Sequence, residues 1–217
     1  MTQVAIVDYG MGNLRSVHQA LAHAAGSESG LTITADPEEV ARAERVVLPG
    51  VGAMGDCMSE LGRLELTQAL REAAVRKPLL GICLGMQALV ERSEESGGVS
   101  GLGVLPGQAI RVPAGERGAD GRPLKVPHMG WSRVHQVRGH PLWSGIRDAT
   151  WFYFVHGYYV HAGSPEHVVG EAEHGRRFAA AIARGPCFAV QFHPEKSQDA
   201  GLRLYSNFLN WDGSWSE

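Results

Sequence analysis

The stretch Pro78-Leu-Leu-Gly-Ile-Cys-Leu-Gly85 decides the fold of this chain. Its apolar first half, Pro78 to Ile82, predicts a buried strand, and the segment from Leu84 to Glu91 predicts a helix that follows at once. Cys83 stands at the junction, with one glycine two residues before it and another two residues after it. Small residues at these places let a chain turn sharply from strand to helix.

The same alternation of strand and helix runs through the first half of the chain. Strands are predicted at Val4–Val7, Leu31–Thr34 and Arg45–Leu48. Asn13 is expected to cap a helix whose apolar positions are Leu14, Val17 and Leu21 and which Gly26 closes. A short helix is expected after Asp36-Pro37-Glu38-Glu39, which resembles a capping box, and a longer one at Leu64–Val75. Such alternation predicts a parallel sheet with helices on both faces.

After Gly97 the pattern changes to strands. They are predicted at Ala109–Val112, Trp131–Val137, Trp151–Val160, His167–Glu173, Phe178–Ala183 and Phe188–Phe192, and a helix at Gly201–Leu209 closes the chain. The segment Ala114–Arg122 is rich in glycine and charge, so we expect an exposed excursion there. No segment resembles a linker. We therefore expect one α/β domain over residues 1–217: a mostly parallel sheet flanked by helices, with an antiparallel extension.

Composition excludes several classes of protein. The 217 residues carry a formal net charge of -3, which gives the whole molecule no electrostatic attraction to nucleic acid or anionic lipid. Three cysteines without regular spacing argue against a disulfide framework and favour a reducing cytoplasm. The N-terminus lacks the features of a signal peptide, and no apolar stretch is long enough to span a membrane.

The strand-to-helix junction makes Cys83 a candidate nucleophile. The N-terminus of a helix presents free N–H groups, which favour a thiolate, and the N–H of Leu84 is a natural donor to an oxyanion. The alternative is a small buried cysteine at a strand end, which is the commonest place for this residue. The two flanking glycines favour the nucleophile.

A second candidate group is Phe192-His193-Pro194-Glu195, which follows the apolar strand Phe188–Gln191. Catalytic side chains emerge at strand ends in parallel sheets, and a histidine base needs a third group to orient it. His193 and Glu195 fit these two roles. A plain surface turn is the alternative. A zinc deaminase site would need a downstream P-C-x-x-C, and none follows.

Two glycine-rich turns remain. Pro49-Gly50-Val51-Gly52 also follows a strand and offers backbone N–H groups of Val51 and Gly52 as further oxyanion donors, although a plain turn would look the same. Gly10-Met11-Gly12 is half of a dinucleotide fingerprint, but Arg15 occupies the place of the third glycine. There is no P-loop, and the ten histidines show no metal-ligand spacing. We therefore expect neither a cofactor nor a metal.

These motifs together resemble the class I glutamine amidotransferases, whose members share a flavodoxin-like core. The resemblance rests on residues 81–87, 193–195 and 49–52. Four longer segments are similar to one branch of the family, the glutaminase subunits of imidazole glycerol phosphate synthase. They are Ile6–Leu14, Pro127–Trp131, Tyr153–His156 and His193–Ser197. Two places depart from the branch: Gly157 replaces a small hydroxyl residue, and Ser132 replaces an asparagine.

The resemblance implies roles for individual residues. Cys83 would be the nucleophile, His193 the general base and acid, and Glu195 the group that orients His193. Gln87, Glu95 and the segment His156–Gly157–Tyr158 would bind glutamine. Ammonia would pass to a barrel-shaped cyclase subunit in a heterodimer that serves histidine biosynthesis.

The sequence leaves two alternatives. The first is the glutaminase partner of pyridoxal phosphate synthase or a γ-glutamyl hydrolase, and the second is a non-catalytic interaction protein of the same fold. The branch-specific segments argue against the first, and the intact triad against the second.

Asn13, Trp131 and Lys196 are the candidate contacts to the partner. Trp131 is large and follows a glycine, so it could be an interface hot spot or an ordinary core residue.

Overall fold

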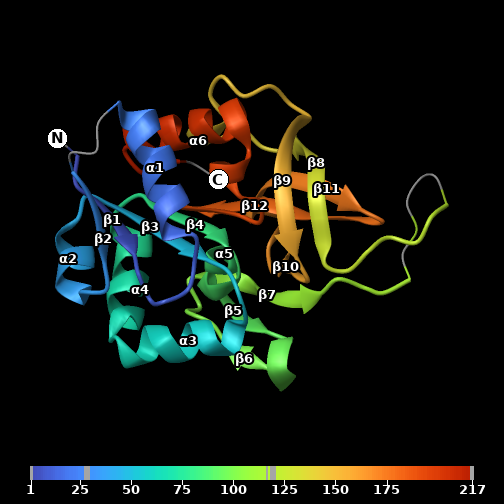
Figure 1. Ribbon diagram of the computed structural model, residues 1–217, viewed down its shortest axis with the longest axis horizontal. Helices are drawn as coiled ribbons and strands as arrows, with labels where there is room; N and C mark the ends of the chain where they lie inside the picture. The colour runs from blue at the N-terminus through green and yellow to red at the C-terminus, as the bar shows by residue number, and fades with distance from the viewer. Residues whose placement is uncertain (1, 27–29, 116, 118–120, 216–217) are drawn as a thin grey trace.

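A twisted nine-stranded sheet forms the centre of the molecule (Figure 1). The structure is a computed structural model and describes residues 2–26, 30–115, 117 and 121–215. The strand order is β2-β1-β3-β4-β13-β12-β11-β8-β9. These strands are β1 (Val4–Val7), β2 (Leu31–Thr34), β3 (Arg45–Gly50), β4 (Leu79–Cys83), β8 (His128–Gln136), β9 (Thr150–His156), β11 (Val168–His174), β12 (Arg176–Arg184) and β13 (Cys187–Val190).

The sheet has a parallel half and an antiparallel half. Strands β2, β1, β3, β4 and β13 pair in parallel, whereas β12, β11, β8 and β9 pair antiparallel. A second sheet of four strands has the order β10-β7-β5-β6 and consists of β5 (Val90–Ser93), β6 (Val99–Ser100), β7 (Leu105–Arg111) and β10 (Tyr158–Ala162). The expected parallel sheet with an antiparallel extension is confirmed.

Helices cover both faces of the parallel half (Figure 1). Ile6 packs in one buried cluster with residues of α1 (Leu14–Ala25) and α6 (Gln198–Asn210). Its neighbour Val7 packs in another cluster with residues of α2 (Pro37–Arg42), α3 (Met54–Arg63), α4 (Leu66–Arg76) and α5 (Leu84–Leu89). Because successive side chains of a strand point to opposite faces, two buried faces require continuous apolar runs such as Val4–Val7. None of the helices in the described ranges is long and apolar enough to cross a membrane.

Three expectations about the elements are corrected. The side chain of Asn13 makes no capping hydrogen bond, although α1 begins directly after it; Asp36 does cap α2, through a 2.8 Å bond from the Glu38 N–H. Helix α3 was not expected. The expected strand Trp151–Val160 is broken at Gly157, because β9 pairs with β8 whereas β10 pairs with β7 in the smaller sheet.

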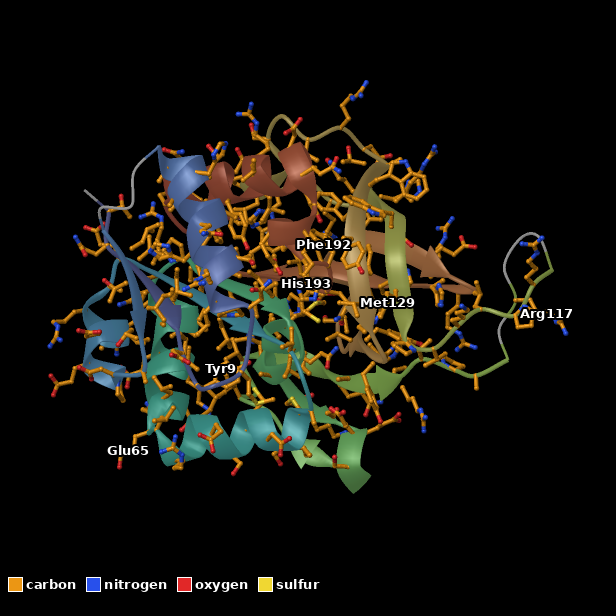
Figure 2. All side chains as sticks on the ribbon, in the orientation of Figure 1. Tyr9, Glu65, Arg117, Met129, Phe192 and His193 are labelled. Atoms are coloured by element: carbon orange, nitrogen blue, oxygen red, sulfur yellow. The ribbon has the colours of Figure 1, made fainter. Side chains whose placement is uncertain are left out.

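The expected excursion at Ala114–Arg122 lies partly outside the described residues, at 116 and 118–120. Arg117 is exposed and lies in the loop between β7 and β8, which extends away from the sheet (Figure 2). Its backbone forms an isolated antiparallel bridge with Pro123.

Candidate active site

Cys83 occupies a strained turn between β4 and α5. Its backbone has φ 53° and ψ -107°, in a region that residues with a side chain rarely adopt. Its neighbours must be small. A Cβ at Gly85 would collide with the carbonyl oxygen of Leu48 on β3, and a Cβ at Gly81 would lie 2.6 Å from Cδ1 of Leu89 and 3.1 Å from Cβ of Ala189. Packing on both sides therefore fixes the turn, and the Cys83 side chain is buried at 5% exposure.

His193 and Glu195 form a buried ion pair. Nδ1 of His193 lies 2.8 Å from Oε1 of Glu195, and the two side chains are 2% and 1% exposed. The backbone around them is held by β9. The His193 N–H donates to the Tyr153 carbonyl at 2.9 Å, and the Ser197 hydroxyl donates to the His193 carbonyl at 2.6 Å. Figure 2 shows His193 in the centre of the molecule.

The register of the sheet brings the two motifs together. Strand β13 pairs in parallel with β4, with Val190 opposite Ile82, so both strands end at the same edge of the sheet. Cys83 is the last residue of β4, and His193 lies shortly after the end of β13. Nε2 of His193 is buried and makes no hydrogen bond to a described residue, so this nitrogen is available for proton transfer.

The charge state of His193 follows from its neighbours. Burial would lower the pKa of this imidazole, but the nearby Cys83 sulfur and the Glu195 carboxylate outweigh it and raise the pKa to about 10. At neutral pH the imidazolium form is therefore favoured beside the sulfur. The other two thiols are inert, because burial raises the pKa of Cys57 to about 11 and that of Cys187 to about 12.

A pocket of about 430 Å³ opens beside Cys83. This volume lies within the range of small-molecule sites, roughly 300–1,000 Å³. The expected oxyanion and substrate residues all line it: Val51, Gly52, Leu84, Gln87, Glu95, His156, Gly157 and Tyr158, with Lys196 at the rim and Pro127 and Val155 completing the wall. Residues that are far apart in sequence thus meet around one thiol.

Strand β3 delivers the glycine-rich turn to this pocket. Gly50 pairs with Cys83 across the sheet, so Val51 and Gly52 follow directly beside the candidate nucleophile. Gly50 cannot carry a side chain, because a Cβ there would collide with the hydroxyl of Tyr9 and lie 3.0 Å from Cβ of Leu84. The backbone of this turn therefore packs closely against Tyr9 and Leu84, which a plain loop would not require.

The structure accommodates both departures from the branch, of which only Gly157 lines the pocket. A Cβ at Gly157 would meet nothing within 4 Å, so its lost side chain leaves open space. Ser132 retains a polar contact, with its Oγ 3.0 Å from Nε2 of His128. Glu95 already uses one carboxylate oxygen, which accepts from the Met54 N–H at 2.7 Å.

The three candidate partner contacts lie outside the core. Trp131 is 43% exposed, and its ring packs edge-on against Tyr153 with centroids 5.8 Å apart. The ammonium of exposed Lys196 lies 5.7 Å from the same Tyr153 ring. Asn13 is exposed at the start of α1, a helix that contacts the short turn Pro194–Lys196. Trp131 is therefore no ordinary core residue.

Sequence reasoning missed three polar residues around the triad. Gln191 is fully buried and donates to the Cys83 sulfur at 3.6 Å. The Tyr205 hydroxyl is buried near Glu195, and burial followed by the carboxylate charge raises the pKa of Tyr205 well above its usual range. Ser197 fastens the His193 turn to β9 by accepting from the Tyr153 N–H at 3.0 Å. A polar residue inside an apolar strand was the signal available for Gln191.

Comparison with known proteins agrees with this geometry. The profile of the family "Glutamine amidotransferase class-I" matches residues 5–210. A solved structure described as a glutamine amidotransferase superimposes with a TM-score of 0.70 at 18% identity, and the match covers 95% of this chain and 99% of that one. The chain therefore belongs to the class I glutamine amidotransferase family.

Relatives within the family are much more similar. The imidazole glycerol phosphate synthase subunit HisH of Methylococcus capsulatus is 55% identical over 217 residues, which is 100% of this chain and 99% of that protein. The subunit of the same name from Pseudomonas putida is 52% identical over 99% of this chain and 100% of that protein.

Proposed function

We propose that this chain is the glutaminase subunit of an imidazole glycerol phosphate synthase and hydrolyses glutamine to glutamate and ammonia. The observation that carries the proposal is the buried His193–Glu195 pair at the strand end adjoining the strained Cys83 turn. Identity of 55% along the whole of a HisH subunit supports this particular synthase over other users of ammonia.

In the first half of the reaction, the Cys83 thiolate attacks the side-chain amide carbon of glutamine. The backbone N–H groups of Leu84 and of the Val51–Gly52 turn hold the oxyanion that forms. The His193 imidazolium then gives its Nε2 proton to the leaving nitrogen. The C–N bond breaks, ammonia departs, and a thioester to Cys83 remains.

In the second half, His193 acts as a base. Once the sulfur is acylated, it no longer carries the charge that favours the imidazolium, so neutral imidazole can take a proton from water. The resulting hydroxide attacks the thioester carbon and the C–S bond breaks, which restores the Cys83 thiolate beside the His193 imidazolium. Glutamate leaves after its new carboxyl group gives a proton to water. Glu195 keeps Nδ1 protonated throughout, which leaves Nε2 to carry the transferred proton.

Binding of the substrate falls to the pocket wall. The Gln87 side chain, the Glu95 carboxylate and the backbone of His156–Tyr158 face the same pocket as Cys83. Their carbonyl and carboxylate oxygens suit the α-ammonium and amide N–H groups of glutamine. The departure at Gly157 is compatible with this role, because its backbone is retained.

The partner in this proposal is a cyclase subunit that binds the ammonia acceptor. The chain has neither a P-loop nor a complete dinucleotide loop to hold a phosphorylated acceptor. Transfer across a sealed interface keeps ammonia from becoming ammonium in water. Asn13, Trp131 and Lys196 form the contact surface, the chain acts as one domain over residues 1–217, and the heterodimer works in the cytoplasm.

A labelling experiment tests the glutaminase assignment. An electrophilic glutamine analogue that alkylates thiols should modify Cys83 and leave Cys57 and Cys187 untouched, as read by peptide mass spectrometry. An excess of glutamine should protect Cys83. Labelling of Cys187, or labelling of Cys83 that glutamine does not slow, would contradict the proposed function.

A further inference from the structure

A chain of hydrogen bonds starts on β8, the strand whose outer face carries Trp131. Oγ of Ser132, on the inner face, lies 3.0 Å from Nε2 of His128. Nδ1 of His128 lies 3.0 Å from Nε2 of His156, and Nδ1 of His156 lies 2.9 Å from the carbonyl oxygen of Tyr158. Two imidazoles thus connect a side chain of β8 to the backbone of the substrate pocket.

The chain continues from the Tyr158 carbonyl to the nucleophile. Nε2 of Gln87 donates to this carbonyl at 2.9 Å and also lies 3.1 Å from Oε1 of Gln191. Nε2 of Gln191 lies 3.6 Å from the Cys83 sulfur. Gln87 is 4% exposed and Gln191 is fully buried, so water competes little for these bonds.

The direction of every bond follows from the carbonyl, which can only accept. His156 must therefore carry its proton on Nδ1, which leaves Nε2 as an acceptor, and His128 must carry its own proton on Nδ1. The hydroxyl of Ser132 is then the donor to His128. By the same logic, the group of Gln87 that faces the carbonyl is its NH₂. The side-chain oxygen of Gln191 accepts from this NH₂ of Gln87. The NH₂ group of Gln191 therefore faces the Cys83 sulfur.

Packing keeps the imidazoles neutral and in place. The ring of His128 stacks against His174 with centroids 4.0 Å apart and against Phe154 with centroids 5.1 Å apart. Burial, followed by the charges of neighbouring histidines, lowers the pKa of His128 to about 3. Burial likewise lowers the pKa of His156 to about 4. Both rings therefore have one donor and one acceptor nitrogen near neutral pH, which the chain of bonds requires.

We propose that Gln191 is a positioning residue that points an amide N–H at the Cys83 sulfur. The Tyr158 carbonyl fixes this orientation through Gln87, and the chain of Ser132, His128 and His156 holds the carbonyl in place. A reversed Gln191 amide would place its carbonyl oxygen against the thiolate and repel it. The observed orientation instead gives the thiolate an N–H donor in addition to the nearby charge of the His193 imidazolium. The inference rests on the proposed function only in taking Cys83 as the nucleophile.

The first test measures Cys83 itself, without turnover. Iodoacetamide alkylates thiolates, so the rate of Cys83 modification in the full chain at neutral pH reports how well the thiolate is stabilised. Gln191→Leu, which keeps the volume and removes the donor, should slow alkylation by about tenfold, the usual effect of losing one hydrogen bond to a charged group. An unchanged rate would overturn the proposal.

The second test separates orientation from packing at His128. His128→Phe keeps the ring in the same stack but removes the hydrogen-bond donor. If this loosens the orientation of the amides, alkylation of Cys83 should slow by about twofold or more, as it does in Gln191→Leu. His128→Asn retains a donor close to the position of Nδ1 and should restore most of the rate. His135→Phe, at an exposed position of the same strand, is the matched control. Equal rates for His128→Phe and His128→Asn would overturn the role of the imidazoles.

A third measurement uses the unaltered chain, so it does not depend on whether a variant folds. Long-range ¹H–¹⁵N NMR of the imidazole rings should find both His128 and His156 protonated at Nδ1. A proton on Nε2 of either ring would break the chain and contradict the inference. If the alkylation and NMR results hold while the protein with its cyclase fails to hydrolyse glutamine, the proposed function is wrong and the positioning role stands.

Discussion

Oε1 of Glu195 lies 2.8 Å from Nδ1 of His193, and neither side chain is more than 2% exposed. A buried carboxylate is stable only beside a cation or several donors. The pair therefore holds the imidazole in one tautomer and favours its charged form, which is the form that can protonate a leaving amine.

Glu195→Gln should reduce glutaminase turnover by about 10²–10⁴-fold, because it removes the charge that favours the His193 imidazolium while leaving the shape intact. The KM for glutamine should change little, since Glu195 lies behind His193 rather than in the pocket. The measurement is steady-state kinetics with the cyclase present. A variant with near-normal kcat would show that Glu195 does not orient the base.

Folding stability should be greatest near pH 6.5 and should fall on either side of it. The pKa of His193 is raised to about 10, so its stabilising effect is complete below its ordinary value of 6.5 and is lost as pH rises through 10. The pKa values of His128 and His156 are lowered to about 3 and about 4, so the unfolded chain binds more protons below pH 6.5 and stability falls from there downward.

Urea unfolding at several pH values measures this dependence. His128→Phe removes one of the buried imidazoles whose pKa is lowered, so its stability should fall less steeply below pH 6.5 than that of the unaltered chain. His161→Phe, which changes an exposed ring on β10, should keep the original slope. Identical acid slopes for all three proteins would contradict the account of His128.

Gly201 should tolerate no side chain. A Cβ there would collide with the carbonyl oxygen of Pro194 and lie 3.0 Å from its Cα, so α6 would have to move away from the His193–Glu195 turn. Gly201→Ala should lower the free energy of unfolding by roughly 1–3 kcal/mol, as overpacking does, and reduce turnover. Gly62→Ala is the control.

Gly62 also lies in a helix, but a Cβ there would meet nothing within 4 Å. Its replacement should stabilise the fold by about 0.5–1 kcal/mol through helix propensity and leave turnover unchanged. If both variants gain stability, the packing of α6 on the catalytic turn is not tight.

Trp131→Ala should leave the chain folded and weaken binding of the cyclase. The side chain is 43% exposed, so its removal creates no cavity, whereas the loss of an interface hot spot costs about 2 kcal/mol or more of binding free energy. Thermal unfolding of the lone chain and titration against the cyclase measure the two effects separately.

Trp143→Ala provides the contrast. Trp143 is 4% exposed and donates from its indole to the Val169 carbonyl at 3.2 Å. Its loss should reduce the free energy of unfolding by roughly 3–5 kcal/mol. A Trp131→Ala variant that unfolds like Trp143→Ala, or that binds the cyclase normally, would contradict the interface role.

Much of the fold was predictable because the buried strands are short apolar runs. Val4–Val7 and Leu31–Thr34 have the expected bounds. Strand β4 ends one residue after its expected end at Ile82, and β13 ends two residues before its expected end at Phe192. Helix α3 was missed because its buried positions, Met54, Cys57 and Leu61, are few and separated by glycine and charge. The break at Gly157 was missed because pairing with two different sheets, rather than local sequence, decides it.

The sequence predicted the three candidate catalytic residues but not the residues that contact them. Cys83, His193 and Glu195 carry local signals, since each follows a strand in a motif with its own backbone restriction. His128 carries no such signal, and Gln191 carries only its polarity at the end of an apolar strand. The importance of both residues lies in hydrogen bonds to residues about 30 to 100 positions away along the chain. Such contacts are set by the register of β13 on β4 and of β8 on β9.

One measurement tests the central claim most directly. The complex of this chain with its cyclase is assayed for imidazole glycerol phosphate, with either glutamine or ammonium salt as the nitrogen source, before and after Cys83→Ala. The account predicts that the variant loses the glutamine-dependent reaction by a factor on the order of 10³ or more and keeps the ammonia-dependent one. Glutamine-dependent synthesis that survives in Cys83→Ala would contradict it.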